Sequence, residues 1–302
     1  MIFSDLLGVR LNDIPPQQAV ETILSYLGSL TARYVVTVNP EFLMAGMEKK
    51  WFQDLLNRSD LALSDGIGIA WAREFFQKIP NWLPYMPKPL YRRCFIRWIW
   101  CASLVRFAFL SMTHHKRDLE RTAGSDLLIT LLKECHSSQG VFLVGARAGV
   151  ASLAKTKLLD RFKHLSIVGA QAGLSFIRIA QTGIQYDKFE NERLVEQIRR
   201  ASPSIVAVAF GQIKQEAWIT EHLFQFPSVK VFIGVGGTLD FIAGTTRRSP
   251  LFLQKVGLEW LWRLMVEPKR IVRIWTAVVR FPRAVLAQAQ QEVEQLSHGS
   301  VA

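Results

Sequence analysis

Short runs of β-branched and aliphatic residues alternate along most of the chain with longer segments in which apolar residues recur at helical spacing. The short runs predict strands, the first over residues 6–11 and later ones over residues 34–38, 61–63, 141–144, 166–169, 205–210 and 229–235. Strands that alternate with helices in this way are typical of a mostly parallel α/β sheet. We therefore expect one such sheet with flanking helices.

The alternation stops over residues 77–120. Within this segment residues 94–112 are mostly apolar and about long enough to cross a bilayer. They also contain Arg97 and Arg106, and an arginine at the centre of a span costs roughly 2.5 to 3.5 kcal/mol. A helix or hairpin lying in the membrane interface avoids that cost and is the interpretation we favour. A helix packed on the body of the protein and a membrane span are the alternatives.

Beyond Pro250 the pattern is helical to about residue 295, and it contains no strand signal. We accordingly divide the chain into three parts. Residues 1–76 and 121–250 form the α/β core, residues 77–120 a hydrophobic, basic insert that contacts a membrane, and residues 251–302 a C-terminal helical appendage that also lies at the membrane.

Charge is concentrated in the insert and the appendage. The whole 302-residue chain carries a net charge of +12. Residues 77–121 contain nine Lys and Arg against two acidic residues, and residues 255–283 contain seven against two. Six of the nine Trp lie in the same two windows. Basic residues mixed with Trp favour an anionic membrane surface as partner. Nucleic acid is the rival partner, and we expect none because Phe, Leu, Ile and Val crowd these windows.

The chain has three Cys and no C-x-x-C pair, which favours a reducing compartment without disulfides. Its first residues lack a basic stretch, and their apolar run is too short for a signal peptide. We expect a cytoplasmic protein that associates peripherally with the inner leaflet of the cell membrane. The residues leave the oligomeric state open, homo-oligomers included.

Polar side chains follow the predicted strands where each one ends. Thr37 and Asn39 close the second strand, and Asp65 follows the third. Carboxyl ends of parallel strands meet at the edge where such sheets hold ligands, so a site is expected there. Asp65 has the position of a general base, although an Asx-turn or a helix cap is the commoner role at such a junction. Asn39 similarly either contacts a ligand or caps the next helix.

Two further strand ends offer contacts to a ligand. Gly234-Val-Gly236-Gly237-Thr238 either lets the backbone approach a phosphate at a helix N-terminus or is a plain turn. Lys214 and Gln215, after Gly211, either hold a phosphate or a polar ring or are surface residues of a first helical turn. The chain has no G-x-G-x-x-G and no Walker A sequence, which disfavours standard dinucleotide and ATP sites.

Arg263, Arg270 and Arg273 in the appendage are separated by seven and three residues. On one continuous helix this spacing brings them to one side, although Pro268 interrupts the pattern. They form either a clamp for a diphosphate or lipid headgroup or a solvated basic face. The six His make no metal site, since H-E-x-x-H is absent and His114 and His115 are adjacent. We expect no metal.

Seven short motifs in register resemble the WecG/TagA/CpsF glycosyltransferases (glycosyltransferase family 26): Thr37–Glu41, Asp65–Gly68, Arg121–Asp126, Phe142–Gly145, Lys214–Glu216, Gly234–Thr238 and Gly257–Leu261. The resemblance implies a Rossmann-like core and an inverting transfer from a UDP-sugar to a polyprenyl-diphosphate-linked acceptor in cell-surface polysaccharide synthesis. The sugar implied is N-acetylmannosamine, its uronate or a related hexose. No metal or other cofactor is implied.

The same resemblance implies roles for individual residues. Asp65 is the expected general base, with Thr37 beside it in the catalytic group. The substrate-binding residues implied are Asn39, Gly66, Arg121, Gly145, Gly211, Lys214, Gln215, Gly236, Gly237, Arg263, Arg270 and Arg273. One departure is Gly211-Gln212-Ile213, where the family usually has Gly-Ala-Pro. The rival classes are a nucleotide-dependent oxidoreductase or epimerase of the Rossmann type, and a non-catalytic basic membrane adaptor.

Overall fold

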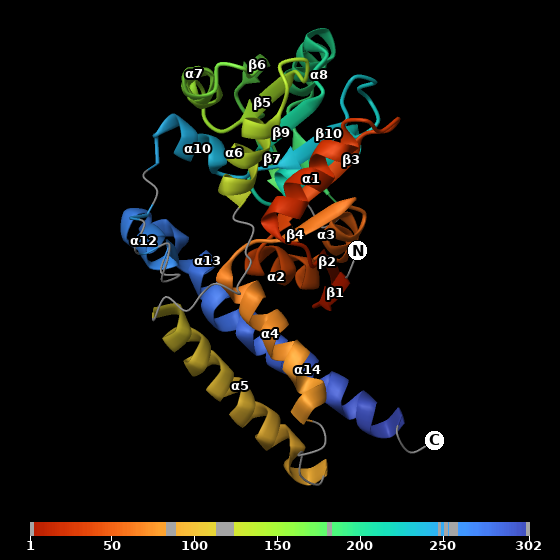
Figure 1. Ribbon diagram of the computed structural model, residues 1–302, viewed down its shortest axis with the longest axis vertical. Coiled ribbons are helices and arrows are strands. Elements are labelled where there is room, and N and C mark those ends of the chain that lie inside the picture. Colours follow the sequence, from red (N-terminus) through yellow and green to blue (C-terminus); the bar gives the residue numbers. More distant parts are fainter. Residues whose placement is uncertain are drawn as a thin grey trace.

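The computed structural model describes residues 3–82, 89–112, 124–179, 183–246, 249–250, 253 and 259–299. An α/β body carries a helical extension on one side, and the chain ends on that extension (Figure 1). The body contains one eight-stranded sheet in the order β1-β2-β4-β3-β10-β9-β5-β6, with helices on both faces. The predicted Rossmann-like, mostly parallel α/β fold is thus confirmed.

Neighbouring strands of this sheet run parallel, apart from the antiparallel pair β1 and β2. Strands β7 and β8 form a separate antiparallel hairpin. The bounds are β1 (Phe3–Leu6), β2 (Val9–Asn12), β3 (Arg33–Val38), β4 (Leu61–Ser64), β5 (Val141–Gly145), β6 (Ile167–Gln171), β7 (Phe176–Ile179), β8 (Ile184–Tyr186), β9 (Ile205–Ala209) and β10 (Val231–Gly234).

The prediction of a single strand over residues 6–11 is wrong. Leu7 and Gly8 both have positive φ, 53° and 78°, and reverse the chain between β1 and β2. Two consecutive residues of positive φ match the twist of a tight hairpin. The backbone N–H of Gly8 also donates to the carboxylate of Asp5 at 3.1 Å. The apolar side chain of Leu7 concealed this turn in the sequence.

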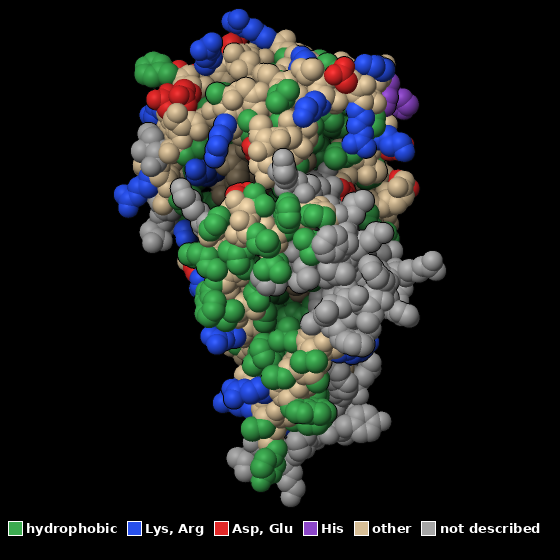
Figure 2. Space-filling view, turned by 90° about the vertical axis from the view of Figure 1, so that its left-hand side faces the viewer, with side chains coloured by type: hydrophobic (Ala, Val, Ile, Leu, Met, Phe, Trp, Pro, Cys, Tyr) green, Lys and Arg blue, Asp and Glu red, His purple; other side chains and the backbone are tan. Residues whose placement is uncertain are grey.

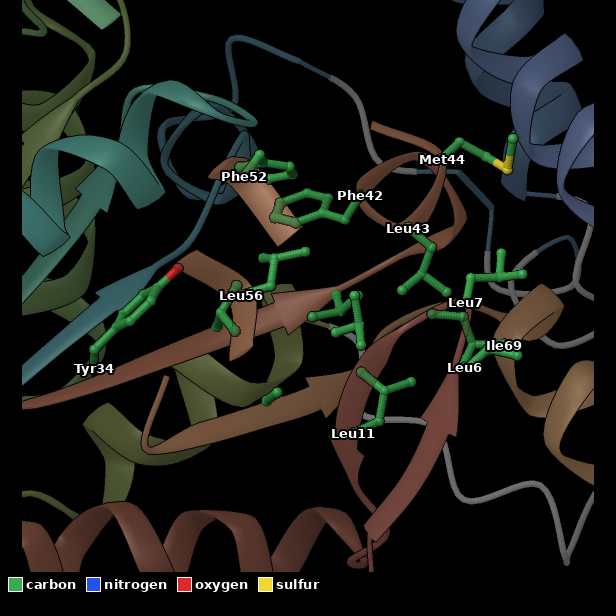
Figure 3. Close-up of a cluster of buried hydrophobic side chains, with 14 of the residues drawn as sticks. Leu6, Leu7, Leu11, Tyr34, Phe42, Leu43, Met44, Phe52, Leu56 and Ile69 are labelled. Atoms are coloured by element: carbon green, nitrogen blue, oxygen red, sulfur yellow. The ribbon is translucent and has the colours of Figure 1, made fainter. Parts of the chain in front are cut away.

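Each face of the sheet is buried, because successive residues of the central strands point to opposite sides. Val36 packs in the core under α2, α3, α8 and α9, whereas Val35 packs in the core under α1, α6, α7 and α10. Figure 3 shows part of the first core, with side chains from the strands meeting others from α2 and α3. The bounds are α1 (Pro16–Tyr26), α2 (Pro40–Glu48), α3 (Lys50–Asn57), α6 (Gly124–Glu134), α7 (Val150–Arg161), α8 (Lys188–Ala201), α9 (Lys214–His222) and α10 (Thr238–Ala243).

Helices α4 (Ile67–Trp82) and α5 (Pro89–Met112) lie beside α14 (Phe281–Gly299) in the extension (Figure 1). Ile96 and Ile99 of α5 are buried in this contact. The Trp100 Nε1 atom donates to the carbonyl oxygen of Pro282 at 3.0 Å. Residues 94–112 therefore belong to one helix that packs one stripe of side chains on the protein. None of the described helices is long and apolar enough to span a membrane.

The rest of the appendage is a series of short helical segments: α12 (Glu259–Val266), the 3-10 turn η3 (Pro268–Arg270), α13 (Ile271–Trp275) and the π-helical turn η4 (Thr276–Arg280). Pro268 begins η3, as its missing N–H and fixed φ favour at a helix start. Two ion pairs fasten this series to α2, one between Arg273 Nε and Glu41 Oε2 and one between Arg280 Nη2 and Glu48 Oε1, both at 2.6 Å.

Candidate functional site

A cavity of about 1190 Å³ opens at the carboxyl ends of β3, β4, β5, β9 and β10. Residues of η3 and α13 line it from the other side. Figure 2 shows the surface hollowed between the α/β body and the helical extension. The site therefore lies where the topology of a parallel sheet predicts it, and the appendage forms one of its walls.

Asp65 lines this cavity together with Thr37 and Asn39. Strands β3 and β4 are in register, with Val38 opposite Ser64, so the residues that follow them lie side by side. The backbone N–H of Asp65 donates to the carbonyl oxygen of Val38 at 2.7 Å, which fixes the chain at this point. Parallel pairing thus brings a carboxylate beside a hydroxyl and an amide.

Asn39 caps a helix and also lines the cavity. Its Oδ1 atom accepts a hydrogen bond from the backbone N–H of Phe42 at 3.1 Å, so the predicted cap of α2 is confirmed. The same residue lines the cavity. Because a capping asparagine uses its oxygen, its NH₂ group is the part that can donate to a ligand.

Gln215 is buried and joins two loops of the site. Its Oε1 atom accepts a hydrogen bond from the backbone N–H of Gly236 at 3.0 Å, and its Nε2 atom donates to Glu216 Oε1 at 2.6 Å. The Gly236 amide is therefore used within the protein. The glycine run lines the cavity through Gly236 and Gly237, and one of its amides is occupied by this internal bond.

Lys214 and Arg147 are the cations of the cavity that lie on the sheet side. The Lys214 Nζ atom lies 4.8 Å from the ring centroid of Phe176, at cation–π distance. Phe176 meets the ring of Phe210 edge-on at 5.3 Å, and both rings line the cavity. Among the described residues, no carboxylate lies within salt-bridge distance of Lys214 or Arg147. This wall thus combines apolar rings with two cations.

Arg270 and Arg273 line the opposite wall, each with a glutamate partner. Arg270 Nε lies 2.6 Å from Glu267 Oε2, and Arg273 Nε lies 2.6 Å from Glu41 Oε2. The structure brings both arginines to the cavity that Asp65 lines, although the appendage is remote in sequence. Arg121 lies outside the described residues, as does the side chain of Arg263, whose backbone belongs to α12.

The predicted glycines differ in what they do. Gly211 lines the cavity, whereas Gly66 and Gly145 do not. Gly66 has a φ of 96°, which a glycine adopts without strain. A Cβ atom on Gly145 would lie 2.4 Å from the backbone of Ala209, so this glycine permits two neighbouring strand ends to approach.

Gly145→Ala should destabilise the protein by roughly 2 to 4 kcal/mol, since the new methyl group clashes with backbone and the φ of 122° disfavours any Cβ. Urea unfolding measures this change. Gly149→Ala is the matched control, because Gly149 has a φ of 81° and nothing within 4 Å of the added atom. Its cost should be about 1 kcal/mol. Equal costs for the two variants would show that the clash is not the cause.

Several residues of the cavity were missing from the predicted site: Arg147, Phe176, Phe210, Thr238, Asp240 and Glu267. Phe210 directly follows β9, and Arg147 is the second residue after β5, so the strand-end rule could have found them. Phe176 belongs to the hairpin of β7 and β8, which no sequence pattern indicated.

No group of three or more His, Cys, Asp and Glu with the arrangement of a metal site occurs in the described part of the chain. His222 is buried and stacks on Trp218 at 4.5 Å, and burial lowers the pKa of its imidazole. His114 and His115 lie outside the described residues.

Large hydrophobic side chains are exposed on the extension. Trp98 and Val105 of α5 are 67% and 71% exposed, and Val272 and Trp275 of α13 are 71% and 55% exposed. On the side of the molecule drawn in Figure 2, hydrophobic side chains gather over the helical extension, and Lys and Arg lie among them and along the edge. Val266 of α12 is also exposed and lines the cavity, so exposed hydrophobic residues of the extension reach the cavity.

Comparisons with known proteins agree with one another. The family model described as the WecG/TagA/CpsF glycosyl transferase family matches residues 4–85 and 99–295. Relatives from Staphylococcus aureus strains MRSA252, NCTC 8325 and COL are 27% identical over 273 residues, which cover 89% of this chain and 87% of theirs. Each is named N-acetylglucosaminyldiphosphoundecaprenol N-acetyl-beta-D-mannosaminyltransferase. The unmatched residues between the two family ranges, 86–98, fall within residues 77–120.

Proposed function

Because this chain belongs to the WecG/TagA/CpsF family of glycosyl transferases, we propose that it moves an N-acetylmannosamine-type sugar from a UDP-sugar to a sugar on a polyprenyl diphosphate. The relatives' name specifies a mannosaminyl group and an N-acetylglucosaminyl-diphosphoundecaprenol acceptor. The observation that carries the proposal is that Asp65, Lys214, Arg270 and Arg273 line a single cavity. The cavity thus contains a base, a cation for the diphosphate of the leaving UDP, and cations for the diphosphate of the lipid acceptor.

Asp65 acts as the general base in this proposal. The acceptor hydroxyl attacks the anomeric carbon of the donor from the side opposite UDP, and its proton moves to the Asp65 carboxylate. The bond between the anomeric carbon and the UDP oxygen breaks, and UDP leaves with its electron pair. This single displacement inverts the anomeric configuration. Thr37 lies on the adjacent strand and hydrogen-bonds the reacting sugar.

Lys214 and Arg147 neutralise the charge that develops on the departing UDP. They lie on the sheet side of the cavity with the rings of Phe176 and Phe210. Apolar rings suit the flat face of a nucleobase, and fixed cations stabilise a leaving phosphate without rearranging. We propose that these side chains take the place that a divalent metal has in metal-dependent sugar transfer, so product should form in EDTA.

Arg270 and Arg273 bind the diphosphate of the lipid acceptor. An arginine offers two parallel N–H donors that match a phosphate, and both arginines line the cavity. In the ligand-free protein they pair with Glu267 and Glu41. Binding of the acceptor then exchanges a glutamate for a phosphate group. This exchange limits the net gain in affinity and favours anions with more than one negative charge.

We further propose that the exposed hydrophobic face rests on the anionic, cytoplasmic leaflet of the cell membrane. Trp98 and Trp275 are suited to the headgroup region, and arginines lie among the hydrophobic residues of α5 and α13. The acceptor's lipid stays in the membrane while its sugar reaches the cavity. No nucleic acid takes part.

The double variant Trp98→Ser/Trp275→Ser should bind anionic vesicles at least tenfold less tightly than the wild type. Each exposed indole that enters the interface contributes roughly 1.5 kcal/mol or more. Sedimentation with phosphatidylglycerol vesicles measures this affinity. Phe189→Ser is the control, because Phe189 is 83% exposed on α8 of the α/β body. Unchanged sedimentation of the double variant would refute the proposed membrane face.

The proposed reaction is tested by incubating the protein with a panel of UDP-sugars and short-chain polyprenyl diphosphate N-acetylglucosamine in EDTA. Mass spectrometry should detect an acceptor heavier by one N-acetylhexosamine residue when UDP-N-acetylmannosamine is the donor. Reduction of nicotinamide, or epimerised UDP-sugar without transfer, would favour the rival enzyme classes. Product only after addition of a divalent metal would contradict the proposed role of Lys214 and Arg147.

A further inference from the structure

Glu216 is a fully buried carboxyl group that the proposed reaction does not use. It is the third residue of α9, so its side chain can reach back to the start of that helix. Its Oε2 atom and the hydroxyl of Tyr34 are both buried, and neither has a hydrogen-bond partner among the described residues. A polar group left in this state costs free energy, so its retention calls for a physical reason.

Two loops of the cavity meet at this carboxyl group. Gln215 Nε2 donates to Glu216 Oε1 at 2.6 Å, while Gln215 Oε1 accepts from the Gly236 N–H of the loop after β10 at 3.0 Å. The backbone N–H of Ile213, in the loop after β9, also interacts favourably with the Glu216 carboxyl group. The Gln215 side chain, which Glu216 holds in place, therefore connects the loop after β9 to the loop after β10.

The loop after β9 has a backbone conformation that needs support, because Ile213 has a φ of 72°, where a β-branched residue is strained. Gly236, in the loop after β10, has a φ of 52°, which a glycine adopts without strain. The Gln215 side chain packs directly on Gly234, because a Cβ atom there would lie 2.7 Å from its Nε2 atom. The shape of this wall depends on the hydrogen bonds that Gln215 and Glu216 make.

We propose that Glu216 is a positioning residue, which holds the loops after β9 and β10 in the shape that binds the diphosphate of the donor. It acts through Gln215 and does not touch the substrate. The identity of the ligand rests on the proposed function, whereas the joining of the two loops does not.

The network also predicts a dependence on pH. Burial raises the pKa of Glu216 to about 8, so the carboxyl group is neutral at pH 7 and ionises in more alkaline solution. In the described part of the chain, the titratable side chain that faces it is Tyr34, whose pKa is raised well above its usual value by burial and by the neighbouring Glu216. The folded pKa of Glu216 exceeds its unfolded value of 4.5, so its contribution to stability decreases as pH rises from about 4.5 to about 8.

Three variants test the proposal. Glu216→Gln keeps a neutral side chain with one acceptor oxygen, so at pH 7 it should retain the loops and the affinity for UDP. Glu216→Leu removes the acceptor and leaves the Gln215 amide without its partner. Ile219→Ala is the control, because Ile219 is fully buried on the same helix and makes no side-chain hydrogen bond.

Amide hydrogen exchange of the ligand-free proteins measures directly how well the two loops are ordered. Glu216→Leu should raise exchange over residues 211–217 and 234–238, and should weaken UDP binding at least about tenfold by calorimetry. Ile219→Ala should lower the melting temperature and leave UDP affinity as in the wild type. Wild-type exchange in both loops of Glu216→Leu would overturn the proposal.

Titration from pH 7 to pH 9 gives an independent readout if Glu216→Leu does not fold. UDP affinity of the wild type should fall as pH rises through about 8, whereas that of Glu216→Gln should not show this fall. Identical pH profiles for the two proteins would overturn the proposal. If the wild type binds no UDP, the proposed function fails. Amide hydrogen exchange then still decides whether Glu216 joins the loops, by comparison of Glu216→Gln with the wild type across the same pH range.

Discussion

Replacing Arg270 and Arg273 together by glutamine should lower kcat/KM for the diphosphate-linked acceptor by about 10²-fold or more. Each arginine offers hydrogen bonds to a charged group, and the loss of one such bond costs roughly 1.5 to 3 kcal/mol. The two side chains line the wall of the cavity that we propose binds the acceptor, so their removal should weaken binding of its diphosphate. Initial rates at varied acceptor concentration measure the effect.

Arg280→Gln is the matched control for this double variant. Arg280 pairs with Glu48 as Arg273 pairs with Glu41, yet it does not line the cavity. Its replacement should change acceptor kinetics less than about twofold, within the usual effect of an exposed ion pair. Affinity for UDP should be unchanged in all of these variants. A comparable loss in Arg280→Gln would mean that the arginines act by docking the appendage and not by binding the acceptor.

The sheet and one wall of the site were predictable from the sequence for a single reason. Parallel strands bring their carboxyl ends to one edge, so polar residues that follow apolar runs are neighbours in space. This rule found Thr37, Asn39 and Asp65, and it also found Gln215. Applied to β5, it would have found Arg147 as well.

The role of each glycine was not predictable, because it depends on what lies near the missing Cβ atom. Gly145 and Gly236 both follow or end apolar runs in the sequence. The structure puts the backbone of Ala209 against Gly145, and open space beside Gly236. Only the second glycine lines the cavity.

The sequence pattern also cannot indicate that the appendage and Asp65 line the same cavity. It depends on the packing of α14 against α4 and α5, and on ion pairs such as that of Arg273 with Glu41. Periodicity identifies each helix but gives no relative placement. The apolar run over residues 94–112 similarly favoured contact with a membrane, whereas the structure buries Ile96 and Ile99 of this run where α5 packs on α14.

Replacing Asp65 by asparagine should lower kcat roughly 10²- to 10⁴-fold, the usual contribution of a general base. Asparagine has nearly the same size and cannot accept the proton of the acceptor hydroxyl. KM for both substrates should stay near its wild-type value, since the binding cations are untouched. Asp160→Asn is the control, because the Asp160 side chain is 73% exposed on α7 and lies outside the cavity.

In the proposed reaction Asp65 takes the proton in the step that forms the glycosidic bond. A single-turnover experiment isolates this step, with enzyme in excess over labelled acceptor and UDP-sugar at saturation. The first-order rate of product formation in Asp65→Asn should fall at least about 10²-fold below the wild type, with UDP affinity unchanged. A wild-type rate in Asp65→Asn would mean that Asp65 is not the general base.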